Sequence, residues 1–405
     1  MVSNLPPIWN PFETGYLEDP LAHLRLLREQ NPVHKGINGR WLFLKYDDVK
    51  HFLTNPIFKT VKVSKTIGLK SKLLSGNANF DRLSEISAKW MLFFEPPEHT
   101  ELRSQVARIW NKYDATEIIR ETVEECLALL AELQTVDIIR DFASFIPSRV
   151  VCKLLGLPAE DYFKLRRWSY CFNSMLEPFT TLNDFTKYEV KAREFYDYLG
   201  EIIRQKSERP DEAFVSQLLE ANQDFEKPMN QSEIISVIAF MFFAGIETSI
   251  NLFGESVLLL LKNPLQAQIL REDDSITANA VEELLRFVSP SQYTTRVLAE
   301  DVEIREQKIK AGEFVMGATI SANHDEDIFE DAAQLDFRRT KNPHLSFGFG
   351  LHYCLGARLA RLETFHSLPA LIKRFPAMRL NPDQKYQWDK IIINRGLKTL
   401  PVFLS

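Results

Sequence analysis

One segment, residues 232–262, restricts the possible folds of this chain more than any other. It is apolar on nearly every side and contains no proline. A helix that is hydrophobic all round lies in the core of a large protein or spans a membrane. Its longest apolar runs, such as Val237 to Ile246 and Val257 to Leu261, are too short to cross a bilayer. The segment therefore predicts a helix buried in the middle of the protein.

Helical periodicity also dominates the rest of the chain. Apolar residues spaced by three and four predict further helices near residues 115–135, 147–156, 189–206, 277–288 and 355–374. Strand-like alternation is sparse, and the best candidates are Arg40 to Lys45, Val302 to Ile304, Phe314 to Ala318 and Thr399 to Leu404. No linker, repeat or low-complexity tract divides the sequence. We predict a mainly α protein with small β-sheets, forming one domain over residues 1–405.

Composition limits the possible partners and the compartment. The 405 residues are 45% hydrophobic and 26% charged, which suits a soluble protein with a sizeable core. A net charge of -6 without basic runs argues against a nucleic-acid partner. The N-terminus lacks the cationic start and apolar run of a signal peptide. Four cysteines without a CxxC pair do not make a disulfide scaffold. We expect a cytoplasmic protein that binds neither nucleic acid nor a membrane.

The most informative stretch is HLSFGFGLHYCLGARLARLE, residues 344–363. Gly348 and Gly350 permit a loop with positive φ that lies close against a flat ligand. The apolar stripe from Leu355 to Phe365 predicts a helix, so Cys354 is expected at a helix N-terminus. There the macrodipole and the free N–H groups favour a thiolate. Gly356 would let the backbone approach the ligand.

Three interpretations of Cys354 compete. A lone cysteine in apolar surroundings is most often a buried core residue. His352 and Cys354 are both possible zinc ligands, but no further Cys or His pair lies at zinc spacing. A haem held by a thiolate needs only one such residue and fits the loop better.

FGFGLHYCLG resembles the haem-binding loop of bacterial cytochromes P450. The resemblance implies haem b as the cofactor and Cys354 as the axial ligand of its iron. It places Phe347, Gly348 and Gly350 in the loop on the proximal face, and His352 against a haem propionate.

A second motif is VEELLRF, with Glu283 and Arg286 three residues apart on a predicted helix. Taken alone it is an ordinary helical ion pair worth a few tenths of a kcal/mol. In its place before the cysteine loop it resembles the ExxR motif of the family, whose role is structural. Arg339, in LDFRRT, matches the arginine that completes this network.

The predicted central helix carries AGIETS. A glycine inside a helix costs about 1 kcal/mol relative to alanine, and a threonine can bond its hydroxyl to the i−4 carbonyl. These features predict either a locally kinked packing helix or a groove beside the backbone. AGIETS resembles the oxygen-activation motif of the family. Ala244 and Gly245 would then lie beside the haem, Thr248 would hold dioxygen by a hydrogen bond, and Glu247 would help supply protons.

Further upstream, FFEPPEHTELR places His99 and Arg103 one turn apart after a Pro-Pro helix entry. They are either a surface pair or, because the stretch resembles a family segment, positive donors to the haem propionates. Glu95 replaces the usual Asp of that segment. Arg296, in TTRV, matches a third such donor.

The acidic segment HDEDIFEDAAQLDF lacks the central glycine and the ligand spacing of an EF-hand. It predicts a solvated loop, and it resembles the ANRDPxxFxDP segment of the family.

The motifs occur in the family order from about residue 93 to the end. They imply the cytochrome P450 fold and a monooxygenase that inserts one oxygen atom of O2 into a C–H bond, by hydroxylation or oxidative demethylation. Electrons would come from a ferredoxin and its reductase, or from a flavodoxin-type donor. Arg358 and Arg361 are either part of a basic docking patch for that donor or solvated helix surface.

The resemblance also places six residues around a substrate pocket: Phe240, Phe243, Ser291, Gln292, Ile392 and Ile393. The substrate stays open among terpenoids, fatty acids, polyketides, carrier-bound compounds and methylated sugars. Two other functions are possible. A peroxide-driven peroxygenase usually lacks the acid–threonine pair, which is intact here, and a non-catalytic haem-binding sensor would not need Thr248.

Overall fold

The computed structural model describes residues 7–62, 67, 80–177 and 180–405. They form two compact units, each built from separate stretches of the chain. The first unit comprises the residues up to Lys59, Leu127–Ala143 and Ile250–Ser405, and the second comprises Thr60–Cys126 and Ser144–Ser249. The prediction of a single domain over residues 1–405 stays a prediction.

The first unit contains helices and all of the strands among the described residues. Its helices are α1 (Pro20–Gln30), α2 (Tyr46–Thr54), α12 (Pro264–Glu272), α13 (Thr277–Val288), α14 (Thr319–Ala322) and α15 (Ala357–Arg374). Its strands are β1 (Val33–Lys35), β2 (Trp41–Phe43), β3 (Phe58–Lys59), β4 (Thr135–Asp137), β5 (Tyr293–Leu298), β6 (Val302–Ile304), β7 (Gln307–Ile309), β8 (Phe314–Ala318), β9 (Arg379–Leu380), β10 (Gln387–Trp388), β11 (Leu397–Thr399) and β12 (Pro401–Phe403).

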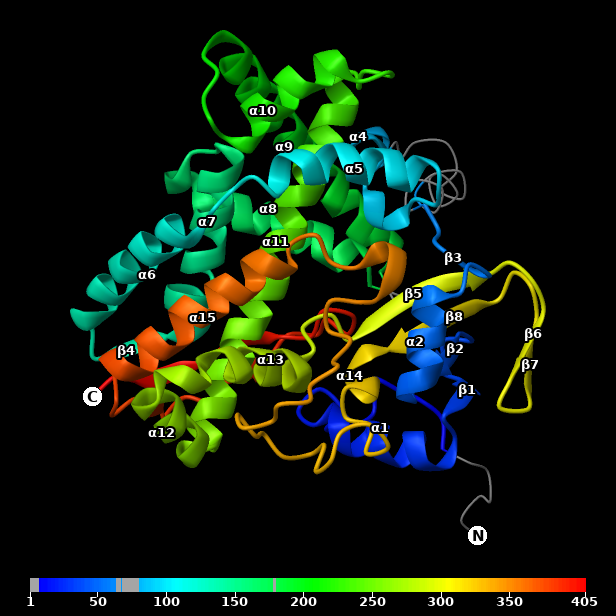
Figure 1. Ribbon diagram of the computed structural model, residues 1–405, viewed down its shortest axis with the longest axis vertical. Helices are drawn as coiled ribbons and strands as arrows, with labels where there is room; N and C mark the ends of the chain where they lie inside the picture. The colour runs from blue at the N-terminus through cyan, green and yellow to red at the C-terminus, as the bar shows by residue number, and fades with distance from the viewer. Residues whose placement is uncertain (1–6, 63–66, 68–79, 178–179) are drawn as a thin grey trace. The chain divides into compact units, whose positions relative to one another are not determined.

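All regular elements in the described part of the second unit are helices (Figure 1). It contains α4 (Asp81–Ile86), α5 (Glu98–Trp110), α7 (Phe145–Leu155), α8 (Tyr162–Met175), α9 (Leu182–Glu208) and α10 (Phe214–Ala221). Two long helices continue from this unit into the first, namely α6 (Thr116–Ala131) and α11 (Gln231–Lys262). The fold is mainly α with small sheets, as predicted.

Helix α11 is the predicted central helix. By length and composition alone it is long and apolar enough to cross a membrane, although its uninterrupted apolar runs are short. In the protein, 72% of its most apolar window is buried. A polypeptide segment that is apolar all round and mostly covered by protein behaves as a core helix, so the prediction of a buried helix is confirmed.

The main sheet has five strands in the order β1-β2-β8-β5-β3. Only the β2–β8 pairing is parallel, and the other pairings are antiparallel. Strands β6 and β8 have the predicted bounds. The predicted C-terminal strand is instead two strands, because β11 pairs with β10 while β12 pairs with β4 and β9.

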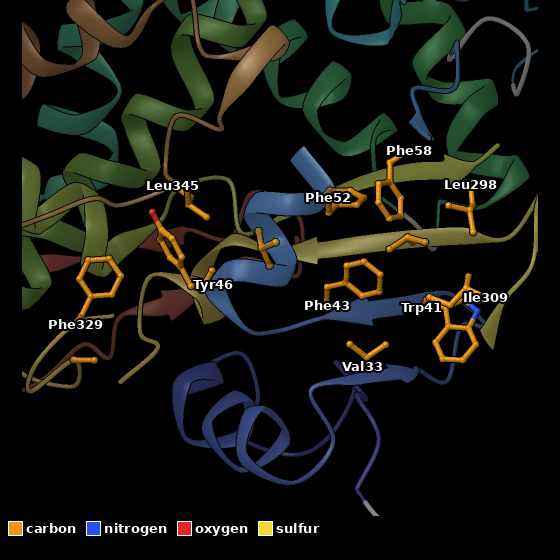
Figure 2. Packing of buried hydrophobic residues seen from close by; sticks show 14 residues of the cluster. Val33, Trp41, Phe43, Tyr46, Phe52, Phe58, Leu298, Ile309, Phe329 and Leu345 are labelled. Atoms are coloured by element: carbon orange, nitrogen blue, oxygen red, sulfur yellow. The ribbon is translucent and has the colours of Figure 1, made fainter. Parts of the chain in front are cut away.

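A hydrophobic cluster packs the main sheet against α2 (Figure 2). Phe43, Phe52 and Phe58 form its centre, with ring centroids 5.3 to 6.1 Å apart. A Cβ on Gly317 of β8 would lie 2.7 Å from the Phe52 ring. Glycine is therefore needed at that position for α2 to lie this close to the sheet.

The helix bounds agree best where local sequence signals are strong. Helix α13 has the predicted bounds, whereas α15 begins at Ala357 instead of residue 355. Helix α9 begins earlier than predicted because Thr181 and Asp184 form a capping box. The apolar stripe of α15 does not reach Phe365, which is 39% exposed.

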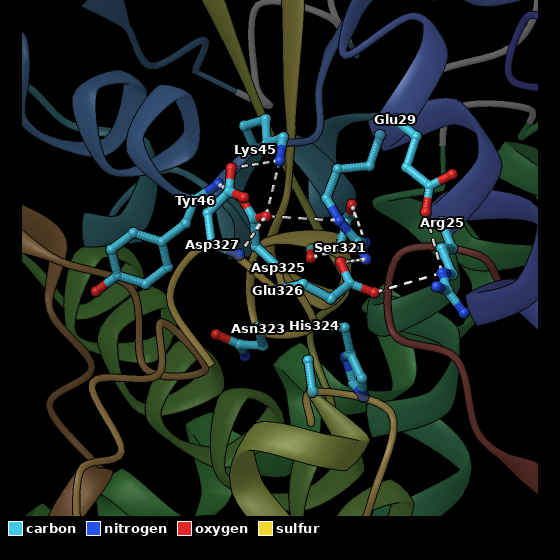
Figure 3. A network of polar contacts seen from close by, with 12 residues as sticks. Arg25, Glu29, Lys45, Tyr46, Ser321, Asn323, His324, Asp325, Glu326 and Asp327 are labelled. Atoms are coloured by element: carbon cyan, nitrogen blue, oxygen red, sulfur yellow. Dashed lines mark hydrogen bonds and ion pairs between the residues drawn. The ribbon is translucent and has the colours of Figure 1, made fainter. Parts of the chain in front are cut away.

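The acidic segment after α14 is largely the solvated loop that the sequence predicted, because Glu326, Asp327, Glu330 and Asp331 are exposed, but Asp325 is an exception. Asp325 is buried, accepts a hydrogen bond from the Tyr46 backbone N–H at 2.9 Å, and lies 3.0 Å from Lys45 Nζ. The Arg28 guanidinium is 3.8 Å away and forms a second pair with Glu326 (Figure 3). The carboxylate therefore ties α1, α2 and the segment after α14 together.

Replacing Asp325 by asparagine is expected to lower the free energy of unfolding by about 2 kcal/mol, because hydrogen bonds to a buried charged group are lost. Urea unfolding monitored by circular dichroism measures the change. The matched control is Asp327→Asn. Asp327 also pairs with Lys45 but is 70% exposed, so its replacement should cost less than about 1 kcal/mol. Equal losses for the two variants would contradict the structural role of Asp325.

Candidate functional site

The cysteine loop of the first unit is closed by main-chain hydrogen bonds. The Cys354 N–H donates to the Phe347 carbonyl at 2.9 Å, and the Tyr353 N–H donates to the Gly350 carbonyl at 3.1 Å. Gly348 and Gly350 have φ values of 71° and 72°. Side chains rarely adopt this conformation, so the two glycines allow the tight turns that the sequence predicted.

Cys354 is the accessible cysteine of the chain. Cys126 and Cys152 are buried and Cys171 is half-buried, whereas Cys354 is exposed. Burial raises the pKa of Cys152 to about 12 and also raises the pKa of Cys171. These thiols are poorly suited to act as thiolates at neutral pH. The core-residue interpretation of Cys354 is therefore wrong.

The surroundings of Cys354 fit a haem. Cys354 lines a surface hollow together with Tyr353, Leu355, Ala357, Arg358, Arg361 and Leu362. A Cβ on Gly356 would lie 3.9 Å from Sγ, in van der Waals contact, so glycine leaves that side of the sulfur open. The described residues contain no group of three or more His, Cys, Asp and Glu side chains able to hold a bare metal ion. A single thiolate suits an iron that a porphyrin already coordinates.

Beyond the cysteine, the two arginines of α15 differ. Arg358 is exposed, but Arg361 forms two bonds of 2.6 and 2.9 Å to Glu282 and lies over the Phe347 ring. Burial raises the pKa of Glu282, but the hydrogen bonds from His344 and Arg361 outweigh it and lower this pKa to about 2. Arg361 therefore supports the loop, and only Arg358 of the two is freely presented on the surface.

Glu283 and Arg286 of α13 form a fully buried bidentate ion pair, with distances of 2.7 and 2.8 Å. Arg339 joins it, with its Nε 3.1 Å from Glu283. Arg286 also donates to the carbonyl oxygens of Asn323, Ala332 and Gln334. The three motif residues therefore lie in contact, and their structural role stays a prediction.

Asn323, which the sequence analysis missed, links this ion pair to the cysteine loop. Its carbonyl accepts from Arg286, and its side chain accepts from the Leu345 N–H at 2.7 Å. Its amide also donates to Ser346 Oγ, which in turn donates to the Leu285 carbonyl of α13. The Leu345 carbonyl accepts from the Gly348 N–H. The sequence shows an asparagine directly after α14. It could not show the role of Asn323, because the hydrogen-bond partners of this residue are distant in sequence.

In the second unit, the AGIETS turn interrupts the burial of α11. Ala244 is exposed in the middle of a helix whose other exposed residues, Gln231 and Lys262, stand at its ends. Thr248 donates its hydroxyl to the Ala244 carbonyl at 3.0 Å. A Cβ on Gly245 would lie 3.1 Å from the Val151 side chain. The absence of a side chain at Gly245 thus lets α7 pack closely against α11. The sequence analysis had related this glycine only to a kink or a groove. Glu247 is buried next to the open turn.

The remaining predicted propionate donors lie in ordered elements. His99 is buried in the first turn of α5 and Arg103 is half-buried one turn later. Burial and then the charge of Arg103 lower the pKa of His99. In the first unit, Arg296 is buried on β5 and His352 is half-buried in the cysteine loop.

The predicted pocket residues are divided between the two units, and those within each unit lie together. Phe240 and Phe243 of the second unit pack on Trp90, whose ring centroid is 4.6 Å from that of Phe243. Trp90 belongs to none of the sequence motifs, so its contact with these two residues was not predicted.

In the first unit, the Gln292 N–H donates to the Ile393 carbonyl at 2.7 Å. Ser291 is half-buried beside it, and Ile392 is buried with Ile393. The segment after α13 and the segment before β11 therefore lie together.

Known proteins resemble the chain over almost its whole length. The polyketide biosynthesis cytochrome P450 PksS of Bacillus subtilis is 33% identical over 98% of this chain and 99% of its own. The vitamin D(3) 25-hydroxylase of Pseudonocardia autotrophica is 33% identical over 97% of this chain and 96% of its own. The solved structure of P450BioI in complex with an acyl carrier protein ligated to hexadec-9Z-enoic acid has a TM-score of 0.85 at 30% identity, covering 96% of this chain and 99% of its own.

The cytochrome P450 family profile matches residues 161–393, which include the central helix, the buried ion pair and the cysteine loop. Proteins of this family bind haem b and draw electrons from a redox partner. Together with the fold and the closed cysteine loop, these matches show that the chain belongs to the cytochrome P450 family and is a haem b-dependent monooxygenase.

Proposed function

We propose that this monooxygenase inserts one oxygen atom of O2 into a C–H bond of a small organic substrate, by hydroxylation or oxidative demethylation. The observation that carries the proposal is the exposed thiol of Cys354 in a closed glycine loop beside α15. Haem b, held by the Cys354 thiolate, would supply the activation of dioxygen.

The protein's own residues have three proposed tasks. Cys354 binds the iron, within a loop shaped by Phe347, Gly348, Gly350 and Gly356. His99, Arg103, Arg296 and His352 hold the haem carboxylates, and Ala244 and Gly245 border the haem on α11. Thr248 and Glu247 hold and relay protons, and the exposed Ala244 turn beside them supports this role.

The proposed electron donor is a ferredoxin with its reductase, or a flavodoxin-type protein, acting in the cytoplasm. No nucleic acid or membrane takes part in the proposed reaction. The exposed Arg358 side chain supports docking of an acidic donor near Cys354.

The substrate class is tested by optical titration of the haem-loaded protein with terpenoids, fatty acids, macrolides and O-methyl sugars. A low-to-high-spin shift with one class identifies the compound that displaces water from the iron. A normal thiolate–CO spectrum without any shift directs the search to carrier-bound substrates. Absence of the thiolate–CO spectrum in folded, haem-loaded protein would overturn the role of Cys354.

A carrier-bound substrate is the second candidate, because one similar protein was solved with an acyl carrier protein that bears a fatty acid. The test compares the spin shift produced by a free fatty acid with that produced by the same acid on a carrier protein. A shift with the carrier-bound acid alone supports this candidate, and equal shifts argue against it.

Replacing Thr248 by alanine is expected to lower the rate of product formation by about 10²-fold while consumption of electrons continues, because a proton-relay hydroxyl is lost. Product formed per NADH consumed measures this uncoupling once a substrate is known. Thr248→Ser keeps the hydroxyl and is the control. A sensor would keep its ligand response in Thr248→Ala, and full retention of coupling would exclude the proposed role.

A further inference from the structure

We propose that the side-chain amide of Gln292 donates a hydrogen bond to the substrate, which therefore carries an acceptor oxygen. This inference rests on the proposed function and deepens it, because it assigns a chemical feature to the substrate. Gln292 then determines specificity for oxygenated compounds over hydrocarbons of the same shape.

Main-chain contacts fix the position of Gln292. It lies between the end of α13 and the start of β5. Its N–H donates to the Ile393 carbonyl at 2.7 Å, and its carbonyl accepts from the Ile320 N–H at 3.4 Å. The backbone N–H and carbonyl of Gln292 are thus both hydrogen-bonded. The side-chain amide is the group of this residue that can bind a ligand.

The amide nitrogen of Gln292 is buried without a hydrogen-bond partner among the described residues. The whole residue is only 1% exposed. Buried polar groups are hydrogen-bonded in the great majority of cases, because an unmade bond leaves the desolvation of the donor uncompensated. An exception at a position predicted to face the substrate indicates a donor kept for a ligand.

The surroundings of this donor make it selective. Ile392, Ile393 and Tyr293 beside it are all buried, so a bond formed there is little weakened by water. A site built to hydrogen-bond a substrate oxygen discriminates strongly against analogues that lack it.

The second unit has a comparable feature. The indole nitrogen of Trp90 is also buried and has no partner among the described residues. Trp90 packs on Phe243, another predicted pocket residue. Like the amide nitrogen of Gln292, the indole nitrogen is a donor and not an acceptor.

A test uses the haem-loaded full chain and the variant Gln292→Met, which keeps the length of the side chain but removes the amide. The probes are cyclododecanone and cyclododecane, which share a carbon ring and differ by one carbonyl oxygen. Optical titration gives the ratio of their dissociation constants. The wild type is expected to prefer the ketone by about 10-fold or more, and the variant to lose this preference.

Unfolding by urea without ligand gives a second readout. Removing an unpartnered buried donor should raise the unfolding midpoint of Gln292→Met. Ser256→Ala removes a buried hydroxyl that also has no partner among the described residues, so it should raise the midpoint but leave the ketone preference unchanged.

Two results would overturn the inference. One is a wild type that shows no preference for the ketone. The other is a lowered unfolding midpoint in Gln292→Met with the preference intact, which would mean that a buried water already satisfies the amide. The reduced CO spectrum separates this failure from failure of the proposed function, because a normal thiolate spectrum leaves the proposed haem ligation standing.

Discussion

Replacement of Cys354 by alanine is expected to abolish the thiolate–CO spectrum and reduce monooxygenase activity to the background rate. No other cysteine can take over, because Cys126 and Cys152 are buried and burial raises the pKa of Cys171. Without an axial thiolate, electron donation toward the O–O bond is lost. The absorption spectrum of the reduced, CO-treated protein measures the effect directly.

Cys171→Ala is the matched control, since it removes a half-buried thiol far along the chain from the loop. It should keep both the spectrum and the activity. The Cys354→Ala protein should remain folded, because the exposed thiol contributes little to the core. A thiolate–CO spectrum that survives in Cys354→Ala would exclude this residue as the ligand.

Replacement of Glu283 by alanine is expected to destabilise the protein by about 3–5 kcal/mol, since it leaves the Arg286 guanidinium buried without its counter-charge. Both side chains are 0% exposed, so water cannot compensate. A loss of this size is a large part of the total stability of a typical domain, about 5–15 kcal/mol. Urea unfolding and the haem content of the purified protein measure it, and an unchanged midpoint would contradict the prediction.

Glu282, the next residue along α13, provides the control. Its pair with Arg361 is about one third exposed, so Glu282→Gln should cost only about 1 kcal/mol. The double variant Glu283→Ala/Arg286→Met should recover only part of the lost stability. It removes the stranded charge, but it leaves the carbonyls of Asn323, Ala332 and Gln334 without their donor.

The sequence alone determined the features that depend on neighbouring residues. The bounds of α13, β6 and β8 follow from local periodicity and were predicted correctly. The glycines of the cysteine loop have the positive φ that their residue type permits. The Glu283–Arg286 pair follows from a spacing of one helical turn. The family motifs are also short runs of neighbouring residues, so family membership could be inferred from the sequence.

Only the tertiary structure decided which distant residues meet. The acidic segment after α14 was expected to be a solvated loop, yet its Asp325 is buried by partners from α1 and α2. Arg361 belongs to the loop support because Glu282, far along the chain, faces it. Asn323 and Trp90 act through contacts that no local pattern encodes. Periodicity reports which face of an element is covered, whereas the identity of the covering residues depends on packing between segments remote in sequence.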